Sequence, residues 1–165
     1  MGDLATFDYL LIPEIAANIL KYDNPKLIKV NKNNIYDYIS IENDPNQLYF
    51  MGPTKYALAY SMVNKRAKNY LLVDNEVVVG CLTLEIDIKE QLYKISNVLV
   101  DRKYLGRGYG KALIKKALLI FSKYNCHTLS LYVSKFNQAA LHTYVKCGFE
   151  VKNSFPNGYE LEYKF

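Results

Sequence analysis

Three glycines separated by single residues carry the clearest chemical signal in the sequence: Gly106, Gly108 and Gly110. They follow an apolar, strand-like run and precede a segment with helical periodicity. Glycines let the backbone take positive φ and let a ligand approach closely, and the first N–H groups of a helix attract anions. Arg107 and Lys111 add positive charge at the same turn. The turn therefore predicts a diphosphate site, with a tight structural turn as the alternative.

Two common phosphate-binding motifs do not fit this turn. The dinucleotide fingerprint needs G-x-G-x-x-G and an acidic residue about 20 residues further on. Here the spacing is G-x-G-x-G, and the predicted strand over 129–134 ends without a carboxylate. A P-loop needs Ser or Thr after its lysine, but Lys111 is followed by Ala112. Neither nucleotide-binding motif is present.

A second segment follows in register with the glycine turn. Residues 129–133 alternate like a strand, and a short helix begins at Asn137. Gly148 ends that helix and precedes the next strand. Asn137, Ala140, Tyr144 and Gly148 together give the pattern N-x-x-A-x-x-x-Y-x-x-x-G.

The two segments resemble the acetyl-CoA-binding region of the GCN5-related N-acetyltransferases (GNAT). Residues 105–110, LGRGYG, are similar to that family's [Q/R]-x-x-G-x-[G/A] turn, and residues 131–149 are similar to its second cofactor segment. The family usually has Gln or Arg where this chain has Leu105, which removes a side-chain contact but leaves the backbone cradle. The resemblance covers roughly residues 92–152.

The resemblance implies an α/β (α+β) fold: a mixed, mostly antiparallel sheet of six to seven strands, flanked by helices and splayed at the acetyl-CoA site. It implies one domain over 1–165, with an N-terminal helical extension (1–26) and the cofactor core at 92–152. The implied reaction is direct acetyl transfer from acetyl-CoA, as cosubstrate, to a small amine such as a polyamine, amino sugar or amino acid. The alternatives are an N-terminal or lysine acetyltransferase of proteins and a non-catalytic CoA-binding domain.

The same resemblance assigns roles to individual residues. Tyr144 matches the tyrosine that protonates the departing CoA thiolate, although a tyrosine packed on the core is the alternative. Residues 92–100 contain no carboxylate, so Glu85 on the neighbouring strand is the best available base, with a water relay equally plausible. The expected cofactor-binding residues are Asn97, Val98, Leu99, Val100, Leu105, Gly106, Arg107, Gly108, Tyr109, Gly110, Lys111, Asn137 and Tyr144.

Composition agrees with a globular protein, and cysteine usage predicts the reducing cytoplasm as its location. The 165 residues are 50% hydrophobic and 22% charged, with a net charge of +5. This mild charge suits an anionic cofactor, and without a long basic run we expect no nucleic-acid partner. We expect no membrane partner, because no apolar run reaches about 20 residues. Cys81, Cys126 and Cys147 lack metal-ligand spacing, so no metal site is expected. Family resemblance alone suggests a homodimer.

The remaining elements must position these residues. Substrate choice is expected to depend on the region between the first strand and the hairpin, where Asp37, Glu42 and Asp44 are candidate acidic contacts and 47–50 is faintly similar to polyamine-acetylating members. The periodicity predicts helices after Pro13, over 33–41, 54–68 and around 113–124, and strands over 27–30, 70–73, 77–86, 92–100, 128–133, 149–153 and 159–165.

Overall fold

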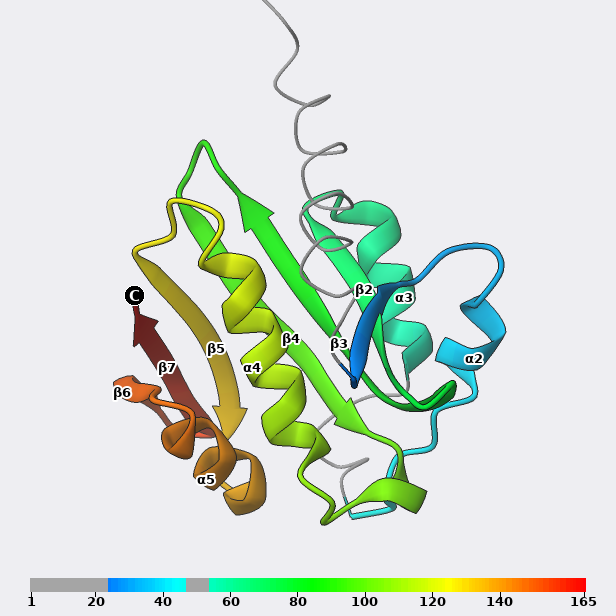
Figure 1. Ribbon diagram of the computed structural model, residues 1–165. Helices are drawn as coiled ribbons and strands as arrows, with labels where there is room; N and C mark the ends of the chain where they lie inside the picture. Colours follow the sequence, from blue (N-terminus) through cyan, green and yellow to red (C-terminus); the bar gives the residue numbers. More distant parts are fainter. Residues whose placement is uncertain (1–23, 47–53) are drawn as a thin grey trace, which may run out of the picture.

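The computed structural model describes residues 24–46 and 54–165 and shows one seven-stranded sheet with helices on both faces (Figure 1). The helix predicted after Pro13 and the segment 47–50 lie outside the described residues. The elements are β1 (Lys26–Lys29), α2 (Ile35–Ile39), α3 (Thr54–Val63), β2 (Ala67–Asp74), β3 (Val77–Asp87), β4 (Leu92–Val100), a 3₁₀ turn (Arg102–Tyr104), α4 (Tyr109–Phe121), β5 (Thr128–Ser134), α5 (Gln138–Lys146), β6 (Glu150–Phe155) and β7 (Gly158–Lys164).

The strand order is β1-β2-β3-β4-β5-β7-β6. Strands β1 to β4 form an antiparallel meander, and β5, β7 and β6 form a second antiparallel group. Helix α4 crosses between the two groups, which makes β4 and β5 parallel. The predicted mixed, mostly antiparallel sheet is confirmed.

The predicted helix over 54–68 is wrong in its second half, because α3 ends at Val63 and β2 begins at Ala67. Asn64 explains the break. Its side-chain oxygen accepts a hydrogen bond from the Arg66 N–H (3.1 Å), an Asx-type turn that competes with helix continuation. The backbone N–H of Ala67 then bonds to the Asn64 carbonyl (3.0 Å), which directs the chain into the sheet.

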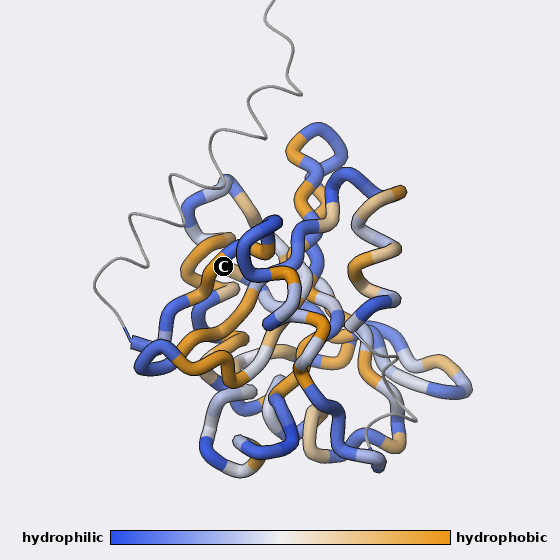
Figure 2. Tube along the Cα trace, turned by 90° about the vertical axis from the view of Figure 1, so that its right-hand side faces the viewer, coloured by the Kyte–Doolittle hydropathy of each residue, from blue (hydrophilic) through white to orange (hydrophobic). Residues whose placement is uncertain are grey.

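Each face of the sheet has its own hydrophobic cluster. Helix α4 buries the predicted apolar stripe against one face, where Leu113, Ala117 and Phe121 are fully buried. Helices α2 and α3 cover the opposite face of β2 to β4, where Tyr38 and Leu71 are fully buried (Figure 1). Figure 2 shows hydrophobic residues gathered along the strands inside the molecule and hydrophilic residues at the loops. None of the described helices has the length and apolar character needed to cross a bilayer.

A β-bulge interrupts β4 where it meets the centre of β3. The register shifts between Thr83 and Cys81, so that Asn97 and Val98 both lie opposite Leu82. Asn97 has φ +51°, a left-handed conformation that asparagine tolerates better than most residues. Strand β4 pairs in register with β5 at Lys94 and Ser130, and the rest of β4 forms no further registered pair with β5. The predicted splay of the sheet is therefore present.

A chain of side-chain hydrogen bonds supports the bulge from the α3 face. The Asn97 amide donates to Thr83 Oγ1 (3.2 Å), and the Thr83 hydroxyl donates to Asn69 Oδ1 (2.7 Å). The Asn69 amide in turn donates to Ser61 Oγ in α3 (2.9 Å). Because Thr83 and Asn69 are buried, losing one member would leave a buried polar group without its partner, which costs about 1–3 kcal/mol.

Gly80 allows β3 and β4 to approach closely beside the bulge. A Cβ at Gly80 would lie 2.5 Å from the backbone oxygen of Leu99. We expect Gly80→Ala to lower the free energy of unfolding by about 1–3 kcal/mol, because backbone must move to relieve the contact. Urea denaturation measures this change. Gly110→Ala is the control, since its Cβ meets only ordinary contacts at 3.9 Å; equal losses in the two variants would contradict the prediction.

Candidate active site

The glycine turn has the backbone geometry that the sequence predicts. Gly106 and Gly108 have φ of +75° and +85°, and a Cβ at either would meet no atom within 4 Å. Gly108 is the N-cap of α4, so the unpaired N–H groups of the first helical turn start directly after it. The first turn of α4 contains no acidic residue and includes Lys111. Backbone N–H groups, helix dipole and lysine together make this turn suited to phosphate oxygens.

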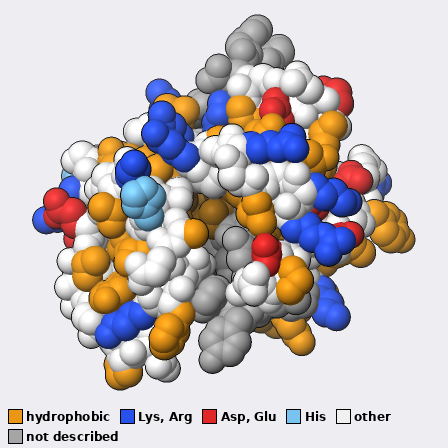
Figure 3. Space-filling model, turned by 90° about the horizontal axis from the view of Figure 1, so that it is seen from below, with side chains coloured by type: hydrophobic (Ala, Val, Ile, Leu, Met, Phe, Trp, Pro, Cys, Tyr) orange, Lys and Arg blue, Asp and Glu red, His pale blue; other side chains and the backbone are white. Residues whose placement is uncertain are grey.

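A cleft of about 320 Å³ joins this turn to the second segment of the sequence. It lies between the start of α4, the end of β4 and α5. Figure 3 views the end of the molecule where α4 begins, and the surface there is hollowed near its centre. The predicted cofactor-binding residues that line it are Val98, Val100, Leu105, Gly106, Gly108, Tyr109, Gly110, Lys111, Asn137 and Tyr144.

Three predicted cofactor residues do not line the cleft. Asn97 directs its side chain to Thr83, Leu99 is buried between the sheet and α2–α3, and Arg107 lies over the Tyr104 ring (5.5 Å to the centroid). Four lining residues were missed: Tyr104, Ala139, Ala140 and Thr143. Ala140 lies one helical turn before Tyr144, and Ala139 lies one turn before Thr143, so the helical spacing of that segment was the signal that could have found them.

Hydrogen bonding fixes the first residue of α4 to a distant hairpin. The Tyr109 hydroxyl donates to Asp74 Oδ2 at the end of β2 (2.6 Å). This hydrogen bond raises the pKa of Tyr109, since the carboxylate acceptor stabilises the protonated phenol. The Tyr109 ring also meets Tyr104 edge-on, with centroids 6.3 Å apart. The glycine turn is therefore held between the β2–β3 hairpin and the 3₁₀ turn.

Tyr144 lies at the floor of the cleft, 7% exposed, with its ring centroid 6.3 Å from that of Phe149. Burial, and to a lesser degree the nearby Cys147, raises the pKa of Tyr144 well above its usual value of 10.0. Asn137 lies at the opposite edge and caps α5, accepting a hydrogen bond from the Ala140 N–H (3.2 Å). A neutral phenol that remains a hydrogen-bond donor is thus available inside the cleft.

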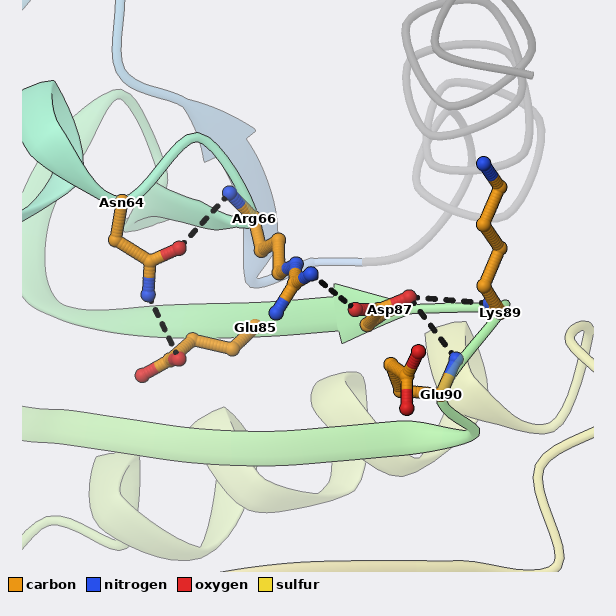
Figure 4. A network of polar contacts seen from close by, with 6 residues as sticks. All are labelled: Asn64, Arg66, Glu85, Asp87, Lys89 and Glu90. Atoms are coloured by element: carbon orange, nitrogen blue, oxygen red, sulfur yellow. Dashed lines mark hydrogen bonds and ion pairs between the residues drawn. The ribbon is translucent and has the colours of Figure 1, made fainter.

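Glu85, the predicted base, lines neither this cleft nor the cavity described next. It lies on the α3 face of β3, where its carboxylate accepts hydrogen bonds from the Asn64 amide (3.0 Å) and the Tyr60 hydroxyl (3.4 Å). Figure 4 shows Asn64 joining Glu85 to Arg66, which pairs with Asp87 (2.8 Å). These contacts connect α3 to β3, and catalysis by Glu85 stays a prediction.

A second cavity of about 370 Å³ lies on the sheet face opposite α4 and α5. Only one β4 residue separates the two cavities along the strand, because Ser96 lines this one and Val98 lines the cleft. The side chains around it combine hydroxyls, aromatic rings and both signs of charge. They are Lys94, Ile95, Ser96, Ser130, Leu131, Tyr132, Phe155 and Glu160.

The acidic residues proposed from the α2–α3 region line neither the cleft nor the second cavity. Glu42 forms an ion pair with Arg102 (2.5 Å), and its backbone N–H bonds to Asp101 (3.1 Å). Asp44 accepts a hydrogen bond from the Asn46 N–H (2.8 Å). These contacts fold the loop after α2 against the end of β4. In the described part of the chain, no group of three or more His, Cys, Asp or Glu side chains could hold a metal ion.

Comparison with known proteins identifies the family. The acetyltransferase (GNAT) family profile matches residues 35–149, which is most of the chain. The chain belongs to this family. Its residues are 28% identical over 97 residues to N-alpha-acetyltransferase 30 of Xenopus laevis, covering 57% of this chain and 36% of that protein. The human protein of the same name is also 28% identical over 97 residues, and the match covers 27% of its length. The chain thus spans about a third of the length of these curated relatives.

Solved structures show the same GNAT fold. Spermidine N-acetyltransferase from Vibrio cholerae, in complex with CoA and spermine, superposes with a TM-score of 0.68 at 17% identity, covering 84% of this chain and 94% of that one. PaiA N-acetyltransferase from Thermoplasma acidophilum, in complex with coenzyme A, gives 0.69 at 16% identity, covering 87% and 100%. At these identities the likeness concerns the arrangement of the elements.

The positive φ of Gly108 gives a test of the phosphate turn. We expect Gly108→Ala to weaken CoA binding at least about tenfold, because a left-handed alanine costs about 1–2 kcal/mol and moves the N–H groups of the turn. Isothermal titration with CoA measures the affinity. Gly148→Ala is the control, since Gly148 has φ +97° but does not line the cleft. Unchanged CoA affinity in Gly108→Ala would contradict the prediction.

Proposed function

We propose that this protein transfers the acetyl group of acetyl-CoA to a primary amine of a small molecule. The observation that carries the proposal is the meeting of two cavities at the β4 bulge. A cleft with a turn suited to anions lies on one face of the sheet, and a cavity lined by both polar and hydrophobic side chains lies on the other. Such an arrangement lets a thioester and an amine approach the same point from opposite sides, which removes much of the entropic barrier.

The reaction needs an electrophile held in place and a stabilised leaving group. The amine lone pair attacks the thioester carbonyl carbon, a C–N bond forms, the C–S bond breaks and the thiolate leaves. Beyond Lys94, the backbone groups of β4 on the β5 side have no registered β5 partner. They are available to the amides of the cofactor arm, and one N–H of β4 can stabilise the negative charge that develops on the carbonyl oxygen.

Tyr144 supplies the proton for the leaving group in this proposal. Because its pKa is raised, the phenol is neutral at physiological pH and can donate a hydrogen bond to the departing sulfur. Transfer of the Tyr144 proton to the thiolate sulfur then gives the free thiol of CoA. The nitrogen loses its own proton to water, since Glu85 lines neither cavity. Water then returns a proton to the Tyr144 phenolate, which restores the acid.

Peptide N-termini are the second candidate acceptors, favoured by the identity to N-alpha-acetyltransferase 30. Two observations support a small amine instead. The volume of the far cavity, about 370 Å³, lies in the range typical of small-ligand pockets. Among proteins of the same fold, the Vibrio cholerae enzyme acts on spermidine.

Release of free CoA from acetyl-CoA over a panel of amines and peptides tests the proposal. We expect turnover on small amines and a roughly hundredfold lower kcat in Tyr144→Phe, the size typical of losing a general acid. Tyr163→Phe is the matched control, because Tyr163 also packs on Phe149 but lies outside the cleft. Turnover on peptides alone would favour the second candidate. Acetyl-CoA binding without turnover on any acceptor would refute the enzyme assignment.

The raised pKa of Tyr144 also predicts the pH dependence of kcat. A raised pKa means that the phenol keeps its proton to higher pH. Deprotonation of Tyr144 therefore cannot reduce kcat at any pH below 10.0, the usual pKa of tyrosine. We expect kcat to rise with pH as the amine deprotonates, and to show no fall between about pH 8 and about pH 10. A fall in that range that is absent from Tyr144→Phe would contradict the prediction.

A further inference from the structure

The far cavity is lined by one carboxylate, that of Glu160, which forms no ion pair among the described residues. Paired residues on neighbouring strands point to the same face of a sheet, so Glu160 lies beside Tyr132 and Glu162 lies beside Ser130. Glu162 forms an ion pair with Lys152 (2.5 Å). Glu160 accepts a hydrogen bond from the Asn153 amide (2.6 Å). The charge of Glu160 also raises the pKa of Lys152, but less than the hydrogen bond and charge of Glu162 do.

Aromatic rings flank this carboxylate. Tyr132 and Phe155 line the cavity, and their ring centroids are 6.2 Å apart. Gly158 leaves room for Tyr132 in this place, because a Cβ there would lie 2.2 Å from the phenol oxygen. Aromatic faces attract cations and pack against methylene groups. A carboxylate beside two rings is therefore suited to an alkylammonium group.

Ser96 marks the other end of the cavity, directly before the bulge. Its hydroxyl is buried and has no hydrogen-bond partner within the described residues. Strand β5 lies between the strands of Ser96 and Glu160, so the two backbones are at least about 10 Å apart at the usual strand spacing. The cavity thus offers two separate polar ends with a hydrophobic wall between them.

We propose that this cavity selects acceptors with a second positive charge, binding a diamine whose attacking nitrogen lies at Ser96 and whose distal ammonium lies at Glu160. This proposal rests on the proposed function and names its substrate class. The methylene chain packs along Tyr132 and Phe155. Lys94, the cation that borders the same cavity, repels the distal ammonium and so favours the orientation in which that group lies at Glu160.

Steady-state rates with putrescine and n-butylamine test this proposal, because the two amines differ in the distal nitrogen. We expect the wild type to favour putrescine in kcat/KM by about tenfold or more, the size of a hydrogen bond to a charged group. Glu160→Gln keeps an acceptor oxygen for Asn153 but removes the charge. It should lower the ratio to about one, mainly by raising KM for putrescine. KM for acetyl-CoA should stay unchanged.

Glu162→Gln is the matched control, since Glu162 lies one pair further along β7, is paired with Lys152 and does not line the cavity. It should keep the putrescine preference. Equal use of both amines by the wild type, or an unchanged preference in Glu160→Gln, would overturn the proposal while leaving amine acetylation intact.

If no amine is acetylated, the proposed function fails, and thermal unfolding of the CoA-bound protein decides this proposal separately. Stabilisation by putrescine that Glu160→Gln abolishes would support the binding site. No stabilisation of the wild type by putrescine would overturn it.

Discussion

The separation of β4 from β5 is the constraint on which both cavities depend. The two parallel strands pair in register only at Lys94 and Ser130, and the bulge at Asn97 then turns β4 away. A continuous ladder would use the backbone groups of β4 within the sheet. Because the ladder stops, those groups are available to a ligand. The buried hydrogen bonds from Asn97 through Thr83 to Asn69 hold this geometry from the α3 side.

Charge is distributed differently on the two faces of the sheet. On the α4 side, the helix N-terminus and Lys111 favour a phosphate-bearing cofactor. On the far side, Glu160 gives the cavity a negative end, while the neighbouring Glu162 is neutralised by Lys152. In the proposed reaction, an anionic cosubstrate and a cationic acceptor are therefore drawn to opposite faces of the sheet. The overall charge of +5 conceals this local asymmetry.

Local sequence patterns predicted the order and type of the elements well, because glycine turns and apolar periodicity act over short distances. They also found most of the cleft, since residues 105–111 and 137–144 each belong to one continuous turn or helix. They failed where a long-range contact decides the outcome. The partners of Glu85 lie in α3, and Glu42 pairs with Arg102. The far cavity combines three residues each from β4 and β5 with one each from β6 and β7, and the alternation along each strand is ordinary in sequence.

Loss of a proton from the acceptor is the remaining chemical demand, since an ammonium group has no lone pair for attack. Residues 92–100 contain no carboxylate, and Glu85 is hydrogen-bonded away from both cavities. A neighbouring positive charge disfavours a charged ammonium and lowers its pKa. Lys94 lines the far cavity two residues before Ser96. In the proposed reaction, repulsion by Lys94 raises the neutral fraction of the nitrogen at Ser96 without a strong base, and water accepts the proton.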